Sequence, residues 1–299
     1  MIKKISEHIY LIDTLALGFE NLVAAYLVTG DSENALIDTG YASSFSKIVE
    51  GLEQIGLRLH EVKYVIPTHL HLDHSGGAFT FIRNSRKSII LCHPRAVKHF
   101  IDPSRLIASV REIYNESTVS FGEVLPVPVE NIRSVQEYER LELGGVTLRF
   151  IYAPGHAPHQ IAVYIEEDQA LVTGDSVSIN YPSSPVKIPT TPPPSYNHSD
   201  ALETLEKLSK ITLKIILRPH FGEDAWAPKY FEEEVRILNE WKDKIEAYIG
   251  KGLGQDEIIN NILEEYDERS KRLFKTIHPL YTSLRLSVLG MVKYLKGER

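Results

Sequence analysis

The run His69-Leu70-His71-Leu72-Asp73-His74 constrains this chain more than any other feature of its sequence. It follows the apolar segment 62–67, which we predict to be a strand. In extended backbone, residues two apart point to the same side, so His69 and His71 can converge on one metal ion. Asp73 and His74 lie where Ser75-Gly76-Gly77 is expected to turn the chain, and from there they can face a second ion.

Three further candidate ligands each follow a predicted strand. His156 comes after strand 145–152, Asp175 after strand 170–173 and His220 after strand 212–217. Loops at one edge of a sheet are the ordinary place for a site in an α/β protein. Two ions with four or five ligands each need about this many donors, so the spacing alone predicts a two-metal His/Asp site.

The order of elements predicts an α/β chain. Apolar or alternating segments predict strands at 8–13, 22–28, 35–38, 62–67, 88–92 and 161–165, in addition to those named above. A helical period covers 43–55, with Ser43 or Ser44 as N-cap and Gly56 as C-cap. A second helix is expected at 200–210, where Asp200 and Glu203 can form a capping box.

The 299 residues suffice for one large domain or two ordinary ones at about 150 residues per domain. Residues 94–135 are irregular apart from a helical pattern at 106–114, and we expect an insertion there. The Pro-rich segment 181–196 is expected to be an ordered loop or a lid. Continuous helical periodicity from about residue 228 predicts a domain at 1–225 followed by a helical region at 226–299.

Composition limits the partners and the compartment. The formal charge of −7 repels polyanions on average, so a nucleic-acid partner is not expected. The single cysteine, Cys92, lies in an apolar run and is expected to be a buried thiol. No apolar run is long enough to span a membrane, and residues 1–4 lead into alternation instead of a signal-peptide core. We therefore expect a cytoplasmic protein without a membrane partner.

The motif Thr-His-x-His-x-Asp-His-x-Gly-Gly at residues 68–77 resembles the metallo-β-lactamase-fold hydrolase superfamily, in particular its glyoxalase II-like branch. The resemblance implies a four-layer αββα sandwich, here with a C-terminal helical appendage. It implies that one metal is held by His69, His71 and His156, the other by Asp73, His74 and His220, and that Asp175 bridges them. It further implies that Asp38 orients a ligand loop. His159 and Tyr181 are expected to line the pocket.

We expect two divalent ions, with zinc as the best match to the ligand set and iron or manganese left open. The implied enzyme is a hydrolase in which a bridging hydroxide attacks the carbonyl of a small ester, thioester or lactone. Asp73 would orient the hydroxide and pass on its proton. The alternatives are a phosphodiesterase acting on RNA and an iron-dependent redox enzyme. The C-terminal helices are expected to serve packing, homodimer contacts or one wall of the pocket.

Overall fold

The computed structural model describes residues 2–114, 120–182, 184–226 and 228–298, and within it the chain forms two compact units. The first unit comprises residues 1–152, 159–174 and 213–224, and it holds the two large sheets. The second unit comprises residues 153–158, 175–212 and 225–299, and it is mainly helical. The predicted boundary near residue 225 lies at one of the points where the chain passes between units, and as a domain limit it stays a prediction.

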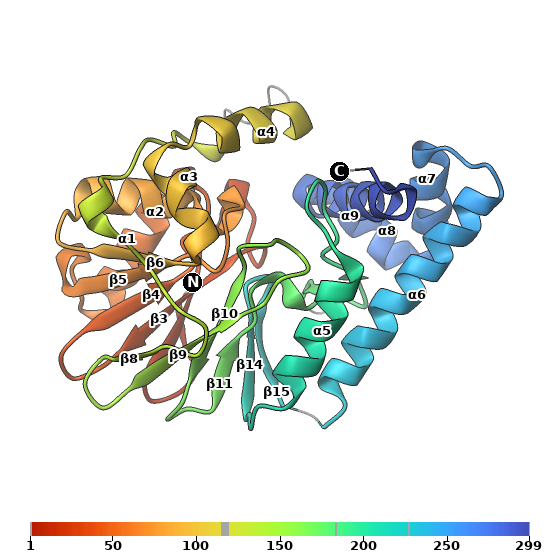
Figure 1. The fold of residues 1–299 in the computed structure, drawn as a ribbon. Helices are drawn as coiled ribbons and strands as arrows, with labels where there is room; N and C mark the ends of the chain where they lie inside the picture. The colour runs from red at the N-terminus through yellow and green to blue at the C-terminus, as the bar shows by residue number, and fades with distance from the viewer. Residues whose placement is uncertain (1, 115–119, 183, 227, 299) are drawn as a thin grey trace. The chain divides into compact units, whose positions relative to one another are not determined.

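Among the described residues, the first sheet of the first unit has seven strands in sequential order. Its strands β3 to β6 are labelled in Figure 1. Its first four strands pair antiparallel and its last four pair parallel, as expected for an opening antiparallel sheet that continues into an α/β pattern. The strands are β1 (Ile2–Lys4), β2 (Ile9–Asp13), β3 (Ala24–Thr29), β4 (Asn34–Ile37), β5 (Val62–Ile66), β6 (Ile89–Cys92) and β7 (Ile132–Ser134). Strand β7 therefore places the end of segment 94–135, which we expected to be an insertion, in the main sheet.

The second sheet of the first unit has the order β15-β14-β11-β10-β9-β8. Strands β8, β9, β10 and β11 pair antiparallel, whereas β11 and β14 pair parallel. The strands are β8 (Arg140–Glu142), β9 (Thr147–Tyr152), β10 (Ile161–Ile165), β11 (Ala170–Val172), β14 (Ile215–Arg218) and β15 (Gly222–Ala225). The predicted strands are confirmed within a few residues, and the short strands β1, β7, β8 and β15 were not predicted.

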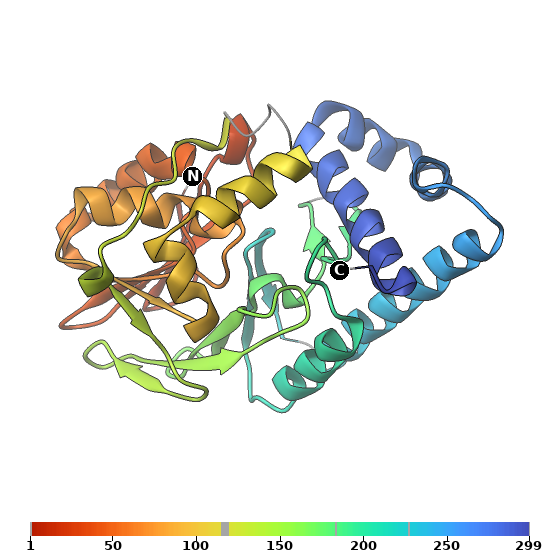
Figure 2. The same ribbon diagram turned by 45° about the horizontal axis from the view of Figure 1, so that its top comes forward.

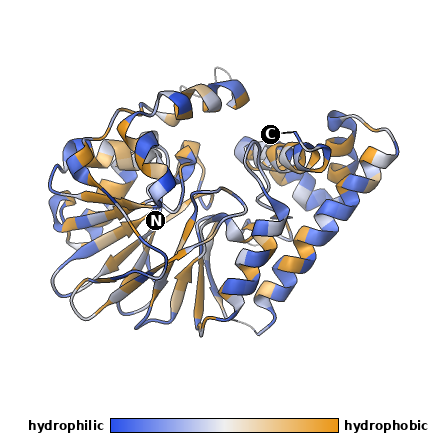
Figure 3. Cartoon of the chain, in the orientation of Figure 1, coloured by the Kyte–Doolittle hydropathy of each residue, from blue (hydrophilic) through white to orange (hydrophobic). Residues whose placement is uncertain are grey.

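Alternation along β3 shows how the first sheet serves two cores. Ala25 and Leu27 face the helices that cover the sheet, whereas Tyr26 and Val28 belong to the core shared with the second sheet. Phe150 of β9 is fully buried in that shared core. Figure 3 shows the corresponding concentration of hydrophobic residues along the strands. Because side chains alternate between faces with a period of two, a shift of one residue would exchange these sets.

Four helices of the first unit follow the strands of the first sheet. They are α1 (Phe45–Ile55), α2 (Leu72–Asn84), α3 (Val97–Ile101) and α4 (Ser104–Tyr114). Helix α1 has Ser44 at the predicted N-cap position, but its side chain makes no capping hydrogen bond. Gly56 ends the helix in the left-handed conformation with φ of 89°, as predicted.

Helix α2 corrects one expectation. We expected the chain to turn at Ser75-Gly76-Gly77, but the helix begins at Leu72, with His71 as N-cap, and these residues lie inside it. The glycines serve close packing instead of a turn. A Cβ on Gly77 would lie 2.6 Å from the carbonyl oxygen of Thr39, and a Cβ on Gly76 would lie 2.8 Å from the amide nitrogen of Ala42. Asp73 and His74 are therefore held on a helix.

The second unit contains five helices and a two-stranded ribbon among its described residues. The helices are α5 (His198–Ser209), α6 (Tyr230–Gly250), α7 (Gln255–Glu265), α8 (Glu268–Thr276) and α9 (His278–Lys296), and the ribbon pairs β12 (Ile179–Asn180) with β13 (Lys187–Ile188). Helix α9 contacts α6, α7 and α8 (Figure 2). The helical periodicity predicted from about residue 228 is confirmed.

The start of α5 corrects a second expectation, because the predicted capping box of Asp200 and Glu203 does not begin the helix. Asn197 is the N-cap, and its side-chain oxygen accepts a hydrogen bond from the amide of Asp200. Cys92 is buried as predicted, and burial raises the pKa of its thiol to about 12. Among the described residues, no helix is both long enough and apolar enough to cross a bilayer.

We predict that Gly77→Ala destabilises the protein by about 1–3 kcal/mol, since overpacking of a close-packed contact costs about this much. The matched change Gly250→Ala, where a Cβ would meet no atom within 4 Å, should be neutral or stabilising. Urea unfolding of both variants measures the difference. Equal midpoints for Gly77→Ala and the unchanged protein would refute the packing role.

Candidate metal centre

The ends of β5 and β14 place five of the predicted ligands together in the first unit, and Asp38 follows the neighbouring strand β4. Asp38 follows β4, and the His69–His74 run follows β5, its parallel neighbour. His220 follows β14, and the carbonyl of Pro219 beside it accepts a hydrogen bond of 2.8 Å from the amide of Ala24 on β3. Strand ends from both sheets therefore meet at one edge, as the sequence predicted.

Asp38 is the residue around which these ligands are arranged. Its side chain is fully buried, and its backbone adopts φ of 57°, which Asp and Asn tolerate better than most residues. Oδ1 accepts hydrogen bonds from the amide of Thr68 at 2.7 Å and from its hydroxyl at 2.9 Å. Oδ2 accepts a third from Nδ1 of His74 at 3.0 Å. The expected orienting role of Asp38 is consistent with these contacts.

Hydrogen bonds at Nδ1 fix the tautomers of His74 and His220. Nδ1 of His74 donates to Asp38, and Nδ1 of His220 donates to the carbonyl oxygen of Leu22 at 2.8 Å. In a neutral imidazole the other nitrogen then carries a lone pair. The two Nε2 atoms face each other at 3.2 Å, and Oδ2 of Asp73 lies 3.6 Å from one and 3.5 Å from the other.

Three electron-rich atoms that point at one another form an arrangement that a cation stabilises. One donor atom from each of Asp73, His74 and His220 lies within 4.8 Å of the others. Two imidazole nitrogens and a carboxylate oxygen are ordinary ligands for zinc and related divalent ions. The donor set therefore fits a divalent metal ion.

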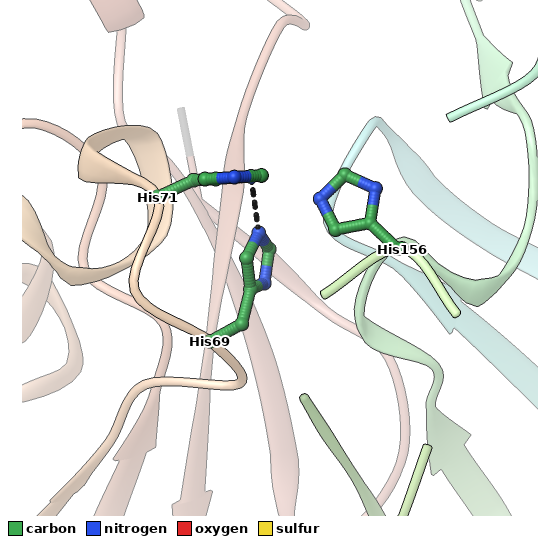
Figure 4. A group of neighbouring side chains, drawn as sticks. All are labelled: His69, His71 and His156. Carbon is green, nitrogen blue, oxygen red and sulfur yellow. Dashed lines mark hydrogen bonds between the residues drawn. The ribbon is translucent and has the colours of Figure 1, made fainter. Parts of the chain in front are cut away.

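His69 and His71 form a second group of donors, and a dashed line joins their rings in Figure 4. The hydroxyl of Thr68 gives its proton to Asp38, so it accepts from Nδ1 of His69 at 3.2 Å. Nε2 of His69 then faces Nδ1 of His71 at 3.0 Å. The ring of His69 also lies 4.2 Å, centroid to centroid, from that of His74. Through Thr68, Asp38 thus orients a histidine in each group.

His156 and Asp175 belong to the second unit, and each is buried. Nδ1 of His156 donates to the carbonyl oxygen of Thr190 at 2.9 Å, so Nε2 is the nitrogen that carries the lone pair. That atom lies 3.3 Å from Oδ2 of Asp175. These two predicted ligands therefore form an imidazole–carboxylate pair of their own.

The two predicted pocket residues differ in placement. The ring of His159 lies in the first unit, 6.5 Å from that of His69 and within 14° of parallel to it. Tyr181 lies in the second unit, is half-buried and accepts a backbone hydrogen bond of 3.2 Å from Ser184. The structure therefore brings His159 to the histidine cluster, and the pocket role of Tyr181 stays a prediction.

Several supporting groups were not predicted from the sequence. Thr68, the carbonyl of Leu22 and the carbonyl of Thr190 each fix a histidine. Thr68 could have been found, because it directly precedes His69 in the motif, whereas the two carbonyls carry no signal in the sequence. Tyr41 also escaped notice; burial, and secondarily the charge of Asp73, raises the pKa of its phenol well above the usual value.

A pocket of about 310 Å³ lies in the first unit beside the start of α2. Most of its wall is apolar, and the polar residues Arg111 and Glu123 complete it. Its lining residues are Leu72, Ile107, Val110, Arg111, Gly122, Glu123, Val124 and Leu125. Segment 94–135 thus forms most of this wall.

The sequence model of the metallo-beta-lactamase superfamily matches residues 18–220, which include every ligand discussed above. This chain belongs to that superfamily. The α/β fold class expected from the resemblance, an αββα sandwich with a helical C-terminal region, is confirmed.

One relative within the superfamily matches most of the chain. The metallo-beta-lactamase fold-containing protein ST1585 of Sulfurisphaera tokodaii is 26% identical over 250 residues, which are 82% of this chain and 89% of that protein. Its crystal structure superposes with a TM-score of 0.65 over 78% of this chain and 86% of that chain. At 24% identity the superposition shows the fold alone.

Two other proteins are similar to this chain over about half of its length. A coenzyme F420H2 oxidase of Methanothermobacter marburgensis is 32% identical over 51% of this chain and 33% of its own length. The atrochrysone carboxyl ACP thioesterase AgnL7 of Paecilomyces divaricatus is 29% identical over 51% of this chain and 38% of its own length. This chain therefore matches only about a third of either protein.

We predict that Asp38→Asn lowers metal affinity by about 10–100-fold, as loss of a hydrogen-bond partner to a ligand typically does. The amide would present N–H to Nδ1–H of His74 or lose its bonds to Thr68, so one histidine must change tautomer. Metal titration against a chelator measures the effect.

The control for this prediction is Asp13→Asn, because Asp13 is also buried and its carboxylate accepts hydrogen bonds from the backbone N–H groups of Leu15 and Asn21. The metal affinity of Asp13→Asn should equal that of the unchanged protein. Equal metal affinities for the two variants would show that Asp38 does not support metal binding.

Proposed function

We propose that this protein is a dinuclear metal-dependent hydrolase that acts on the carbonyl group of a small ester, thioester or lactone. The observation that carries the proposal is the pair of facing Nε2 atoms of His74 and His220, 3.2 Å apart with Asp73 beside them. Fixed lone pairs in this arrangement fit a bound cation. The second donor pair, His69 and His71, supports a second ion.

In this proposal His156 would hold the same ion as His69 and His71, and Asp175 would be a ligand shared by both ions. Chain connectivity supports both assignments. The loop that carries His156 leaves β9 after Tyr152 and returns to β10 at Ile161, and these two residues pair directly. The amide of Ile161 also donates to the carbonyl of Thr68, the residue before His69. Asp175 is bonded to Gly174, the last residue of its segment of the first unit.

Two bound divalent ions would supply Lewis acidity and would lower the pKa of a water molecule toward neutrality. The chain supplies the remaining functions. Asp38 and Thr68 hold the histidines in the tautomers that present the ligand nitrogen. We assign to Asp73, whose side chain is a quarter exposed, the role of accepting a proton and passing it to the leaving group.

The preference for a carbonyl substrate rests on charge and on the pocket. The chain carries a formal charge of −7, which opposes a polyanionic substrate. The pocket beside Leu72 is mainly apolar and suits the hydrocarbon part of an acyl substrate. The similarity to a thioesterase over half of this chain points in the same direction.

The redox alternative retains one supporting observation, the similarity to a coenzyme F420H2 oxidase. The histidine at position 71 argues against it, because the iron-type relatives of this fold place glutamate at that ligand position. We accordingly propose zinc as the resident metal. We also propose a small-molecule substrate, a cytoplasmic location, and packing, dimer contacts or a pocket wall as the role of the C-terminal helices.

We predict two ions per chain in protein that has been fully loaded with zinc and then desalted. Asp175→Asn should lower the affinity for both ions by about tenfold or more, as expected of a ligand shared between them. Elemental analysis and chelator titration measure this.

The matched control is Asp168→Asn, because Asp168 also pairs with a histidine, Nδ1 of His8. It should leave both ions in place. One ion in the unchanged protein, or loss of a single ion from Asp175→Asn, would contradict the assignment.

We predict that kcat/KM for acyl thioesters, esters or lactones exceeds that for RNA or bis-aryl phosphodiesters. Both classes should be assayed at matched metal and salt concentrations, because salt screens the repulsion of a polyanion. A tenfold preference corresponds to about 1.4 kcal/mol of transition-state stabilisation. A tenfold preference for the phosphodiester would replace the proposal with the nuclease alternative.

A further inference from the structure

The C-terminal helices supply no predicted ligand, yet they contact the segment that holds two of them. That segment is the strap, residues 189–191. Thr190 and Thr191 are buried, the latter completely. One side of the strap contacts His156 and Asp175, and the other contacts α6 and α9. All of these residues lie within the second unit.

Thr190 makes the contacts to the two ligands. Its carbonyl oxygen accepts the Nδ1 proton of His156 at 2.9 Å, which leaves Nε2 as the ligand nitrogen. Its hydroxyl donates to the backbone carbonyl of Asp175 at 2.6 Å. A single residue therefore sets the tautomer of one ligand and holds the backbone of the other.

Thr191 makes the contacts to the helices. Its hydroxyl donates to the backbone carbonyl of Ser287 on α9 at 2.7 Å and accepts from the indole N–H of Trp241 on α6 at 3.3 Å. The hydroxyl of Ser287 donates to the carbonyl of Pro189 at the start of the strap. The hydroxyl protons of Thr191 and Ser287 therefore each have an acceptor.

Helix α9 also approaches the strap closely through its backbone. A Cβ on Gly290 would lie 2.0 Å from the carbonyl oxygen of Thr191, so only glycine allows this contact. The strap is thus fixed by two hydrogen-bonded side chains and by direct backbone packing. A buried segment held in this way has little freedom to shift.

We propose that α6 and α9 position the metal centre: through Thr191 they hold Thr190, and Thr190 in turn orients His156 and Asp175. Trp241, Thr191, Ser287 and Gly290 are then positioning residues that touch neither metal nor substrate. This inference rests on the proposed metal centre, and it assigns the C-terminal helices a role in ligand geometry in addition to packing.

The test compares Thr191→Val, which keeps the shape and removes the hydroxyl, with Thr191→Ser, which keeps the hydroxyl. Thr191→Val should weaken binding of zinc by about tenfold, the usual scale for loss of a supporting contact, and Thr191→Ser should restore it. The ion that depends on His156 should be lost first. Nitrogen NMR of the metal-free protein should show the imidazole of His156 leaving the Nδ1–H tautomer only in Thr191→Val.

Ser287→Ala provides a second arm in case Thr191→Val does not fold. Its matched control is Ser270→Ala, a fully buried serine of α8 whose amide is capped locally by Asp267. Ser287→Ala should weaken zinc binding severalfold, and Ser270→Ala should not. Unchanged zinc affinity and an unchanged His156 tautomer in the folded strap variants would overturn the positioning role.

The unchanged protein separates this inference from the proposed function. If it binds no metal, the proposed centre itself is wrong. If it binds two ions and the strap variants bind them equally well, the centre stands and only the positioning role fails.

Discussion

The buried carboxylate of Asp38 is the interaction on which the centre depends. A charge removed from water is stable only when donors surround it, and here the amide and hydroxyl of Thr68 and Nδ1 of His74 supply them. The same bonds fix the tautomers of His69 and His74. The hydrogen bonds that stabilise this one carboxylate therefore orient a ligand in each of the two donor groups.

The fold supplies the positions that this carboxylate needs. Strands β4 and β5 are parallel neighbours, so Asp38 and the histidine run emerge at the same edge. Helix α2 begins within the run, and its glycines let it pack against the backbone at residues 39–42. The site is thus rigid because its ligands extend from strand ends and from a close-packed helix.

Local patterns were sufficient for much of this structure. The alternation in β2 and β3 and the capping residues Ser44 and Gly56 identified their elements correctly. The pattern failed at Gly76 and Gly77, which looked like a turn because their real constraint is a tertiary contact with residues 39–42. The ligand types could be predicted from spacing, but the carbonyls of Leu22 and Thr190 could not, since a backbone oxygen leaves no mark on the sequence.

Anomalous scattering from a zinc-loaded crystal tests the central claim most directly, because it locates each ion relative to named side chains. The account predicts two peaks about 3.5–4 Å apart, as in other two-metal sites. One should lie on His69 and His71, and the other on Asp73, His74 and His220. A single peak, or peaks away from these side chains, would contradict the account.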